Sequence, residues 1–168
     1  MKRSASLREA IRQTKPFESL QVEALLTLSW AGDRLLDAVH VPLREEDLTM
    51  PQYNVLRILR GTPGGLQTHE VCDRMVARAP NLTRLVDRLE AKGLLRRQRS
   101  SRDRRVITLR ITEAGSALVE RVTLPLVRAV NHAMRTLSTP ELRELVRMLN
   151  LLGSSAQEPF PVEEEASS

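Results

Sequence analysis

The chain of 168 residues is poor in cysteine and in aromatic side chains. Its single cysteine, Cys72, cannot form a disulfide within the chain, which excludes a disulfide-stabilised scaffold. The four aromatic residues are Phe17, Trp30, Tyr53 and Phe160. So few rings are a poor stacking surface for single-stranded nucleic acid, and they argue against that class of ligand.

Long apolar runs are also absent. No segment is apolar over the length needed to span a bilayer, and Lys2-Arg3-Ser4 is not followed by the apolar stretch of a secretory signal. We therefore expect a cytoplasmic protein without a membrane partner. His69 and His132 have no metal-ligand spacing to Cys72 or to carboxylates, so neither a metal nor another cofactor is expected. No nucleophile–base pair or phosphate loop is visible, which argues against an enzyme.

Positive charge is what the chain has in excess. The formal net charge is +5, and the segment from Lys92 to Arg110 holds eight basic residues and one acid, Asp103. Such a balance favours a polyanionic partner. The last residues, 154–168, instead carry Glu158 and three further glutamates among prolines and serines, and we expect this acidic tail to be disordered.

Hydrophobic periodicity predicts a mainly α fold with a small β-hairpin. Helices are expected over 4–14, 19–40 (ended by Pro42), 49–59 (capped by Thr49 and Gln52), 67–75, 81–92 (ended by Gly93), 112–134 and 138–152 (ended by Gly153). Strands are expected over 94–99 and 105–111, the second with Ile107, Leu109 and Ile111 on its inner face. The order is typical of a winged helix-turn-helix flanked by further helices.

The helix over 81–92 is amphipathic and suits the major groove of DNA. Leu82, Leu85, Val86 and Leu89 follow helical spacing and should face the core. The outer face carries Asn81, Thr83, Arg84, Asp87 and Arg88. Asparagine suits adenine and arginine suits guanine by bidentate geometry, so Asn81, Thr83, Arg84 and Arg88 are candidate base readers. The alternative is that they are ordinary solvated residues of a surface helix.

The hairpin that follows favours the DNA interpretation. Its arginines lie at 96, 97, 99, 102, 104, 105 and 110, and they would repel one another without an anion nearby. Phosphates and a narrow minor groove supply one. Arg102, Asp103, Arg104 and Arg105 form the predicted tip, where Asp103 would orient an arginine through a local ion pair.

Three segments together resemble the MarR family of bacterial transcriptional regulators. They are Leu48-Thr49-Met50-Pro51-Gln52-Tyr53-Asn54-Val55-Leu56, Asn81-Leu82-Thr83-Arg84-Leu85-Val86-Asp87-Arg88-Leu89-Glu90-Ala91-Lys92-Gly93-Leu94, and Asp103-Arg104-Arg105-Val106 with Leu109-Arg110-Ile111-Thr112-Glu113-Ala114-Gly115. The resemblance covers about residues 20–152. It implies a homodimer on a pseudo-palindromic operator, with Asp103 and Arg105 matching the wing signature and Arg105 entering the minor groove.

The resemblance also implies a division of the chain. We expect an N-terminal extension (1–17), a single domain (18–153) with the winged helix-turn-helix at about 48–112 and dimerisation helices at 18–42 and 112–153, and the tail (154–168). Where the family usually has a glycine and a Ser or Asp cap before the recognition helix, this chain has Val76-Ala77-Arg78. Arg78 cannot cap a helix by accepting a hydrogen bond, and we expect it on a phosphate instead.

Family members often release DNA when a small phenolic or anionic compound binds. A pocket of this kind would use an aromatic wall and a cation, and the candidate residues are Trp30, Arg34, His40, Tyr53 and Arg57. The pairs Trp30 with Arg34 and Tyr53 with Arg57 are four residues apart and share a helix face. The plainer alternative has the two rings in the core and the arginines solvated or ion-paired. Cys72 is expected in a small inward position rather than as a redox sensor.

The sequence thus predicts a homodimeric, sequence-specific regulator that binds double-stranded DNA, acts as a repressor and is released by a small anionic or aromatic ligand. The alternative is a winged-helix interaction protein that has lost operator binding and acts through a protein partner. The predicted wing and the polar recognition face argue against that alternative.

Overall fold

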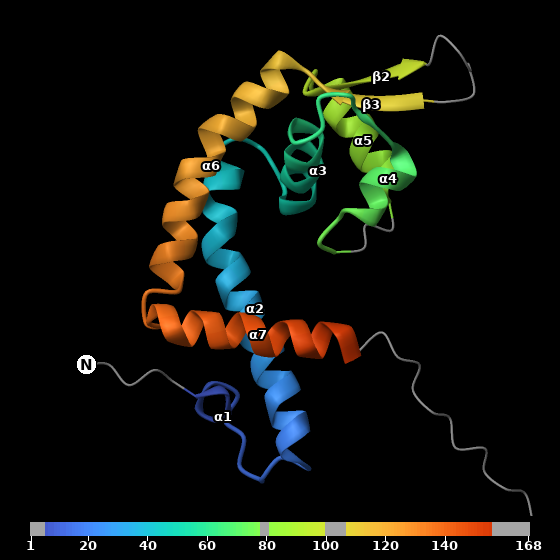
Figure 1. Ribbon diagram of the computed structural model, residues 1–168. Coiled ribbons are helices and arrows are strands. Elements are labelled where there is room, and N and C mark those ends of the chain that lie inside the picture. The colour runs from blue at the N-terminus through green and yellow to red at the C-terminus, as the bar shows by residue number, and fades with distance from the viewer. Residues whose placement is uncertain (1–5, 78–80, 100–106, 156–168) are drawn as a thin grey trace, which may run out of the picture. The chain divides into compact units, whose positions relative to one another are not determined.

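The computed structural model describes residues 6–77, 81–99 and 107–155 (Figure 1). The chain forms two compact units, residues 1–132 and 133–168. Within the described residues the elements are α1 (Leu7–Ala10), α2 (Leu20–Arg44), α3 (Met50–Arg60), β1 (Leu66–Gln67), α4 (Thr68–Asp73), α5 (Leu82–Ala91), β2 (Leu95–Arg99), β3 (Ile107–Ile111), α6 (Glu113–Ala133) and α7 (Thr139–Ser155). The mainly helical fold with a small β wing is confirmed.

The three strands form an antiparallel sheet in the order β1-β3-β2. Leu109 on the central strand is opposite Leu66 of β1 and Arg97 of β2. The sequence did not predict β1, because two residues are too short to show an alternating pattern. Gly65 precedes it with φ +78°, and a Cβ there would lie 2.6 Å from the carbonyl oxygen of Leu109. This turn lets the short strand approach β3 closely.

The hydrophobic core joins the helices of the winged domain to its sheet. Its members with under 2% exposure come from several elements, and they are Leu43, Val55, Leu56, Leu59, Val71, Val86, Leu89, Leu95, Leu109, Val119 and Val122. The first part of α6 therefore packs into the same core as α3 and α5. Helix α5 and the root of the wing therefore pack on the same core.

The predicted caps of α3, α5 and α6 are confirmed. Thr49 and Gln52 form a reciprocal capping box, in which the Thr49 N–H donates to Gln52 Oε1 at 2.9 Å. Gly93 has φ +68°, and the Leu94 N–H donates to the Leu89 carbonyl, which closes a Schellman motif at the end of α5. Thr112 accepts from the Gly115 N–H at 3.0 Å.

A second Schellman motif ends α2, and the sequence did not predict it. The Leu48 N–H donates to the Leu43 carbonyl and the Asp47 N–H to that of Arg44, with Asp47 at φ +51°. The prediction that Pro42 stops this helix was wrong, because the helix extends to Arg44. A proline so near the end removes one hydrogen bond from the last turns, and the buried Leu43 and Leu48 hold the end in place.

Two further helix boundaries and the burial of one strand residue differ from the predictions. α1 ends at Ala10 instead of continuing to residue 14, because Arg12 takes a left-handed φ of 55°. α7 continues past Gly153 to Ser155, since a glycine in a last turn weakens a helix without ending it. Ile107 was expected on the inner face of its strand but is 39% exposed, whereas Leu109 is fully buried. Ile107 lies at the outer end of β3, beyond the reach of the core.

In the second unit, α7 is an amphipathic helix without a buried residue. Glu141 accepts from the Ser138 N–H at 2.7 Å and from its hydroxyl at 2.6 Å, which fixes the start of the helix. Its exposed apolar side chains are Val146, Met148, Leu149, Leu151 and Leu152. Among the described residues of the whole chain, no helix combines the length and the hydropathy needed to span a membrane.

Candidate nucleic-acid interface

Helix α5 is attached to the core by one face and exposes the other. Leu82, Val86 and Leu89 are buried, as the helical spacing predicted, and Leu85 is half-buried against the core. The side chains on the other face are exposed, and they are Asn81, Thr83, Arg84, Asp87 and Arg88. Asn81 occupies the N-cap position, but its side chain makes no capping hydrogen bond. Its amide is therefore available to a ligand outside the helix.

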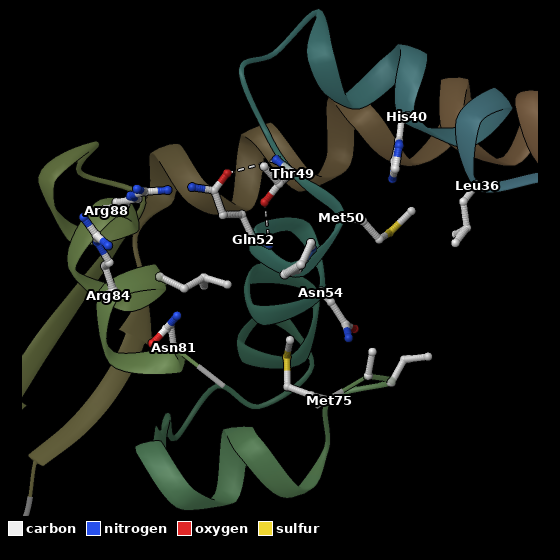
Figure 2. Close-up of a pocket in the computed structure, with 14 residues that line it drawn as sticks. Leu36, His40, Thr49, Met50, Gln52, Asn54, Met75, Asn81, Arg84 and Arg88 are labelled. Atoms are coloured by element: carbon white, nitrogen blue, oxygen red, sulfur yellow. Dashed lines mark hydrogen bonds between the residues drawn. The ribbon is translucent and has the colours of Figure 1, made fainter. Parts of the chain in front are cut away.

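The exposed side chains of α5 lie beside two different hollows. Arg84 and Arg88 line a cavity toward α2 and α3, and Figure 2 shows them on the side of the helix that faces Thr49 and Gln52. Thr83 and Asp87 line a groove shared with α4, which Arg84 also lines. The exposed surface of α5 is therefore basic on the side of α2 and α3, and carries the hydroxyl of Thr83 and the carboxylate of Asp87 on the side of α4.

The predicted tip of the wing lies outside the described residues. Arg102, Asp103, Arg104 and Arg105 fall there, and so does Arg78, the predicted phosphate contact. The base of the wing is described: Arg99 pairs with Ile107 across β2 and β3. The roles of the five residues remain predictions.

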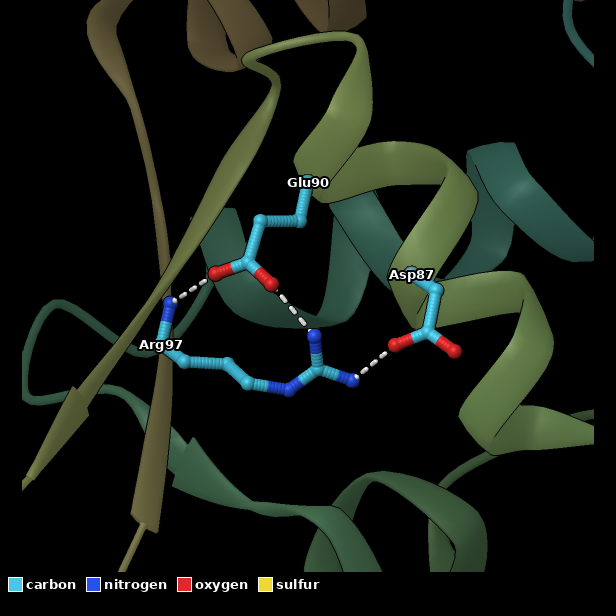
Figure 3. Close-up of polar contacts among 3 residues, drawn as sticks. All are labelled: Asp87, Glu90 and Arg97. Carbon is cyan, nitrogen blue, oxygen red and sulfur yellow. Dashed lines mark hydrogen bonds and ion pairs between the residues drawn. The ribbon is translucent and has the colours of Figure 1, made fainter.

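One wing arginine already has its anions within the protein. Arg97 Nη2 lies 2.6 Å from Asp87 Oδ1, and its Nη1 contacts Glu90 Oε2 (Figure 3). The Arg97 backbone N–H also donates to Glu90 Oε1 at 2.8 Å. The backbone hydrogen bond, followed by the Arg97 side chain, holds the pKa of Glu90 below its ordinary value. The expectation that all seven wing arginines need an external anion was therefore wrong for Arg97.

The sequence missed this three-residue arrangement, although a signal for it was present. Asp87 and Glu90 are three residues apart and therefore lie on one side of α5. That side faces β2, which follows α5 after the short Gly93 turn. An acidic pair directed at an arginine-rich strand was detectable, but the strand register that selects Arg97 was not.

Two ion pairs connect the segment that follows α2 to the end of α5 and to α6. Lys92 Nζ lies 2.7 Å from Asp47 Oδ2, which joins the two Schellman ends of α2 and α5. Arg121 of α6 binds Glu46 through two hydrogen bonds of 2.7 and 2.9 Å. Hydrogen bonds from these cations lower the pKa of both carboxyl groups. Because all four groups are solvent-accessible at least in part, these pairs orient the elements more than they stabilise the fold.

The cavity beside α5 has a volume of about 680 Å³. Its walls come from α2, the start of α3, the turn after α4 and the flank of α5, and Figure 2 shows the side chains around it. Much of the lining is apolar, with Leu36, Met50, Met75, Val76 and Leu85. The polar groups His40, Asn54, Asn81, Arg84 and Arg88 complete it. The space is large enough for a small aromatic molecule.

Of the five residues predicted for a ligand pocket, His40 lines this cavity and the other four do not. Tyr53 is 6% exposed, and its hydroxyl lies 3.4 Å from Thr123 Oγ1. Arg57 donates to Asn54 Oδ1 at 3.2 Å. The Arg34 guanidinium stacks 5.0 Å from the centre of the Trp30 ring. Tyr53 is therefore a core residue, as the alternative interpretation predicts. The arginines that line the cavity are Arg84 and Arg88, which the sequence predicts to contact DNA.

Cys72 is exposed, contrary to the prediction of an inward position. Helix α4 has six residues, and Val71 takes its buried position, which turns the next side chain outward. Cys72 lines the groove between α4 and α5 together with His69 and Asp73. In the described part of the chain, no group of three or more histidine, cysteine or carboxylate side chains could hold a metal ion.

Comparison with known proteins gives a consistent family assignment. A family model described as the MarR family matches residues 46–106. The transcriptional repressor MdtR of Bacillus subtilis (strain 168) is 30% identical over 108 residues, which cover 64% of this chain and 69% of that protein. The crystal structure of a MarR transcription factor from Planctomyces limnophilus is 35% identical, with a TM-score of 0.62, and the match covers 81% of this chain and 99% of that one.

A further solved structure shares the fold at lower identity. Sco3205, a MarR family transcriptional regulator from Streptomyces coelicolor crystallised in complex with DNA, is 22% identical with a TM-score of 0.72. The match covers 87% of this chain and 94% of that one. At this identity the likeness shows the fold alone.

Proposed function

Because this chain belongs to the MarR family of DNA-binding transcriptional regulators, we propose that it acts as a homodimeric repressor, which a small anionic or aromatic compound releases from its operator. The observation that carries the proposal is α5, whose apolar stripe is buried while Asn81, Thr83 and Arg84 are exposed directly before the wing. This is the arrangement that places a recognition helix in the major groove and a wing beside it.

In the proposed complex the two parts of the interface have different roles. Asn81, Thr83, Arg84 and Arg88 contact base edges, and each good bidentate pair contributes about 1–3 kcal/mol of discrimination. Arg105 enters the minor groove, Arg102 and Arg104 contact the flanking backbone, Asp103 orients Arg105, and Arg78 holds a phosphate. A protein of this kind acts at the nucleoid, in the cytoplasm of a bacterium.

The proposed dimer is supported by apolar surface that each unit leaves uncovered. In α2, Leu20 and Leu25 are 77% and 67% exposed, and in α6 Leu124 is 56% exposed. In α7, Leu151 and Leu152 are 59% and 56% exposed. Exposed apolar side chains on three helices outside the winged domain indicate an interface with another chain. A second copy would bury them and would place two recognition helices on a palindromic site.

The proposed effector site is the cavity beside α5. A planar ring fits between the apolar groups of Met50, Met75 and Leu85, and its anionic group would accept hydrogen bonds from Arg84 or Arg88. The same arginines are proposed to contact DNA. An anion bound in the cavity would therefore compete with the operator for their side chains, which gives a direct reason for release.

The first experiment selects bound fragments from a random duplex library with the purified protein at near-physiological salt. Recovery of a pseudo-palindrome with half-sites about one helical turn apart would support the symmetric DNA-reading dimer. Salt-sensitive binding without an enriched motif would contradict it, and would favour the alternative of an interaction protein that has lost operator binding. Within residues 6–77, 81–99 and 107–155, no observation favours that alternative or an enzyme.

The recovered duplex then tests the effector. Aromatic carboxylates, phenols and aliphatic acids of equal charge are titrated against the protein–duplex complex. The proposed site predicts release by aromatic anions at concentrations where the aliphatic acids have no effect, and Met50→Ala should weaken the response by removing one wall of the cavity. Equal release by all the acids would indicate simple ionic competition and would contradict a built effector site.

A further inference from the structure

Arg97 differs from the neighbouring arginines of β2 because its side chain is directed at the protein. Along β2, Leu95 is buried, Arg96 is exposed and Arg97 is half-buried, so Arg97 faces the protein. Its side chain reaches back to the recognition helix, where it bridges Asp87 and Glu90. Its guanidinium is thus occupied by two carboxylates, one on each of its terminal nitrogens.

Glu90 makes a second contact that ordinary ion pairs lack. Because β3 is the central strand, β2 is an edge of the sheet, and its outward N–H groups have no neighbouring strand. The Arg97 N–H is such a group, and Glu90 Oε1 accepts from it at 2.8 Å. The recognition helix therefore holds both the backbone and the side chain of this strand at one residue.

The contact is placed where it fixes the root of the wing. Arg97 lies opposite Leu109, which is fully buried, and Arg99 lies opposite Ile107 two residues farther along each strand. Residues 100–106 connect Arg99 to Ile107 in the chain, so the direction of these two strands sets where that segment begins and ends. A clamp at Arg97 determines that direction relative to α5.

We propose that Asp87, Glu90 and Arg97 form a positioning clamp, which holds the wing in register with the recognition helix so that one DNA duplex contacts both. Arg97 acts through the wing and touches no phosphate. The inference rests on the proposed function, since it concerns how the same DNA-binding surface is assembled. It removes Arg97 from the set of wing arginines that contribute to the electrostatic attraction of DNA.

Two physical roles have to be separated by the test. Arg97 also offsets one of the two negative charges that Asp87 and Glu90 place on the recognition helix, and this charge effect alone would favour DNA binding without any positioning. The triple variant Asp87→Ala/Glu90→Ala/Arg97→Ala removes two negative charges and one positive charge, which makes the chain more positive by one. A purely electrostatic role predicts that this variant binds every duplex as tightly as the wild type or more tightly.

The positioning role predicts the opposite for the selected operator. Losing one well-placed contact of a DNA-binding arginine costs between about five-fold and 150-fold in affinity, and a misdirected wing should cost on the order of ten-fold. The triple variant should therefore bind the selected duplex about ten-fold more weakly, while its affinity for a random-sequence duplex stays equal or rises. Arg97→Lys keeps the charge but has one nitrogen in place of the two that contact Asp87 and Glu90 separately, so it should lose part of the specific affinity.

The matched control is Arg96→Ala, which removes one arginine from the exposed face of the same strand. It should weaken binding to both duplexes by the same factor. Thermal unfolding of all variants identifies any loss of fold, and binding is measured at a temperature where each is folded.

The outcomes are distinct. A triple variant that binds the selected duplex as well as the wild type overturns the clamp. So does a triple variant that loses the same factor of affinity for both duplexes, because that result would show Arg97 to attract DNA itself. If the triple variant does not fold, Arg97→Lys decides, and unchanged specific affinity for that variant contradicts the inference. If the wild type selects no duplex from the library, the result contradicts the proposed function itself. This outcome is distinct from failure of the clamp, which is measured by comparing the variants on a selected duplex.

Discussion

Replacing Gly115 with alanine should destabilise the winged domain strongly. Gly115 lies in the first turn of α6, buried against the root of the wing. A Cβ at this position would lie 2.1 Å from the carbonyl oxygen of Leu94 and 2.9 Å from Cγ1 of Ile111. Ordinary contacts of a Cβ begin at 3.4 Å, so the helix and the strand root must separate.

The obstructing atom is backbone, and it already has a role. The Leu94 carbonyl accepts from the Thr112 N–H at 3.1 Å, and Thr112 in turn caps α6. Inserting a methyl group into a packed site typically costs about 1–3 kcal/mol, and we expect the upper end here because a backbone atom cannot rotate away. At about 3 kcal/mol, the midpoint of thermal unfolding should fall by roughly 6–12 °C for a protein of this size.

Gly153 provides a matched control, because it also lies in a helix and a Cβ there meets nothing within 4 Å. Gly153→Ala should leave the midpoint unchanged or raise it, since alanine is favoured over glycine in a helix by about 0.5–1 kcal/mol. Far-UV circular dichroism at one fixed protein concentration measures both variants. An unchanged or higher midpoint for Gly115→Ala would refute the close approach of α6 to Leu94.

Further predictions concern DNA binding and pH. Arg84→Ala should cost about 1–3 kcal/mol at selected base pairs and relax specificity there, whereas equal loss on all duplexes in a competition assay would show a phosphate contact. Arg105→Ala should weaken binding to all duplexes and lower the salt slope by about one, and an unchanged slope would remove Arg105 from the interface. Because its contacts with Arg97 lower the pKa of Glu90 below the ordinary 4.5, they stabilise the fold above that pH and lose this effect as the pH falls through the lowered value. Thermal midpoints are measured from about pH 7 to about pH 3, a range that includes the titration of carboxyl groups. Over this range the midpoint should fall less for Glu90→Gln than for the wild type. Parallel curves for the two proteins would contradict the prediction.

The elements set by local rules could be predicted from the sequence. Leu82, Val86 and Leu89 repeat at helical spacing, and the structure buries all three. Thr49 caps its helix by a hydrogen bond to a residue three positions away, which is a local interaction that the sequence displays directly. Such patterns depend on residues that are close in the sequence, so they can be read without knowledge of the tertiary contacts.

What could not be predicted depends on contacts between distant segments. β1 exists because Leu66 meets Leu109, forty-three positions later, and two residues alone show no period. Cys72 was misplaced because a single turn of helix does not indicate which of two adjacent residues is buried. The cavity beside α5 is assembled from four segments, so residue pairs chosen within one helix could not locate it.

Arg84 links the two halves of the proposed mechanism. It lies on the recognition helix, where it is available to DNA, and it also lines the cavity shared with α2 and α3. The Lys92–Asp47 and Arg121–Glu46 ion pairs connect the segment that follows α2 to the end of α5 and to α6. A ligand that binds Arg84 in the cavity would therefore act directly on a side chain that we propose reads bases. Release of DNA then requires no large rearrangement of the fold, because reorienting one or two arginines removes the contacts that distinguish the operator from other DNA.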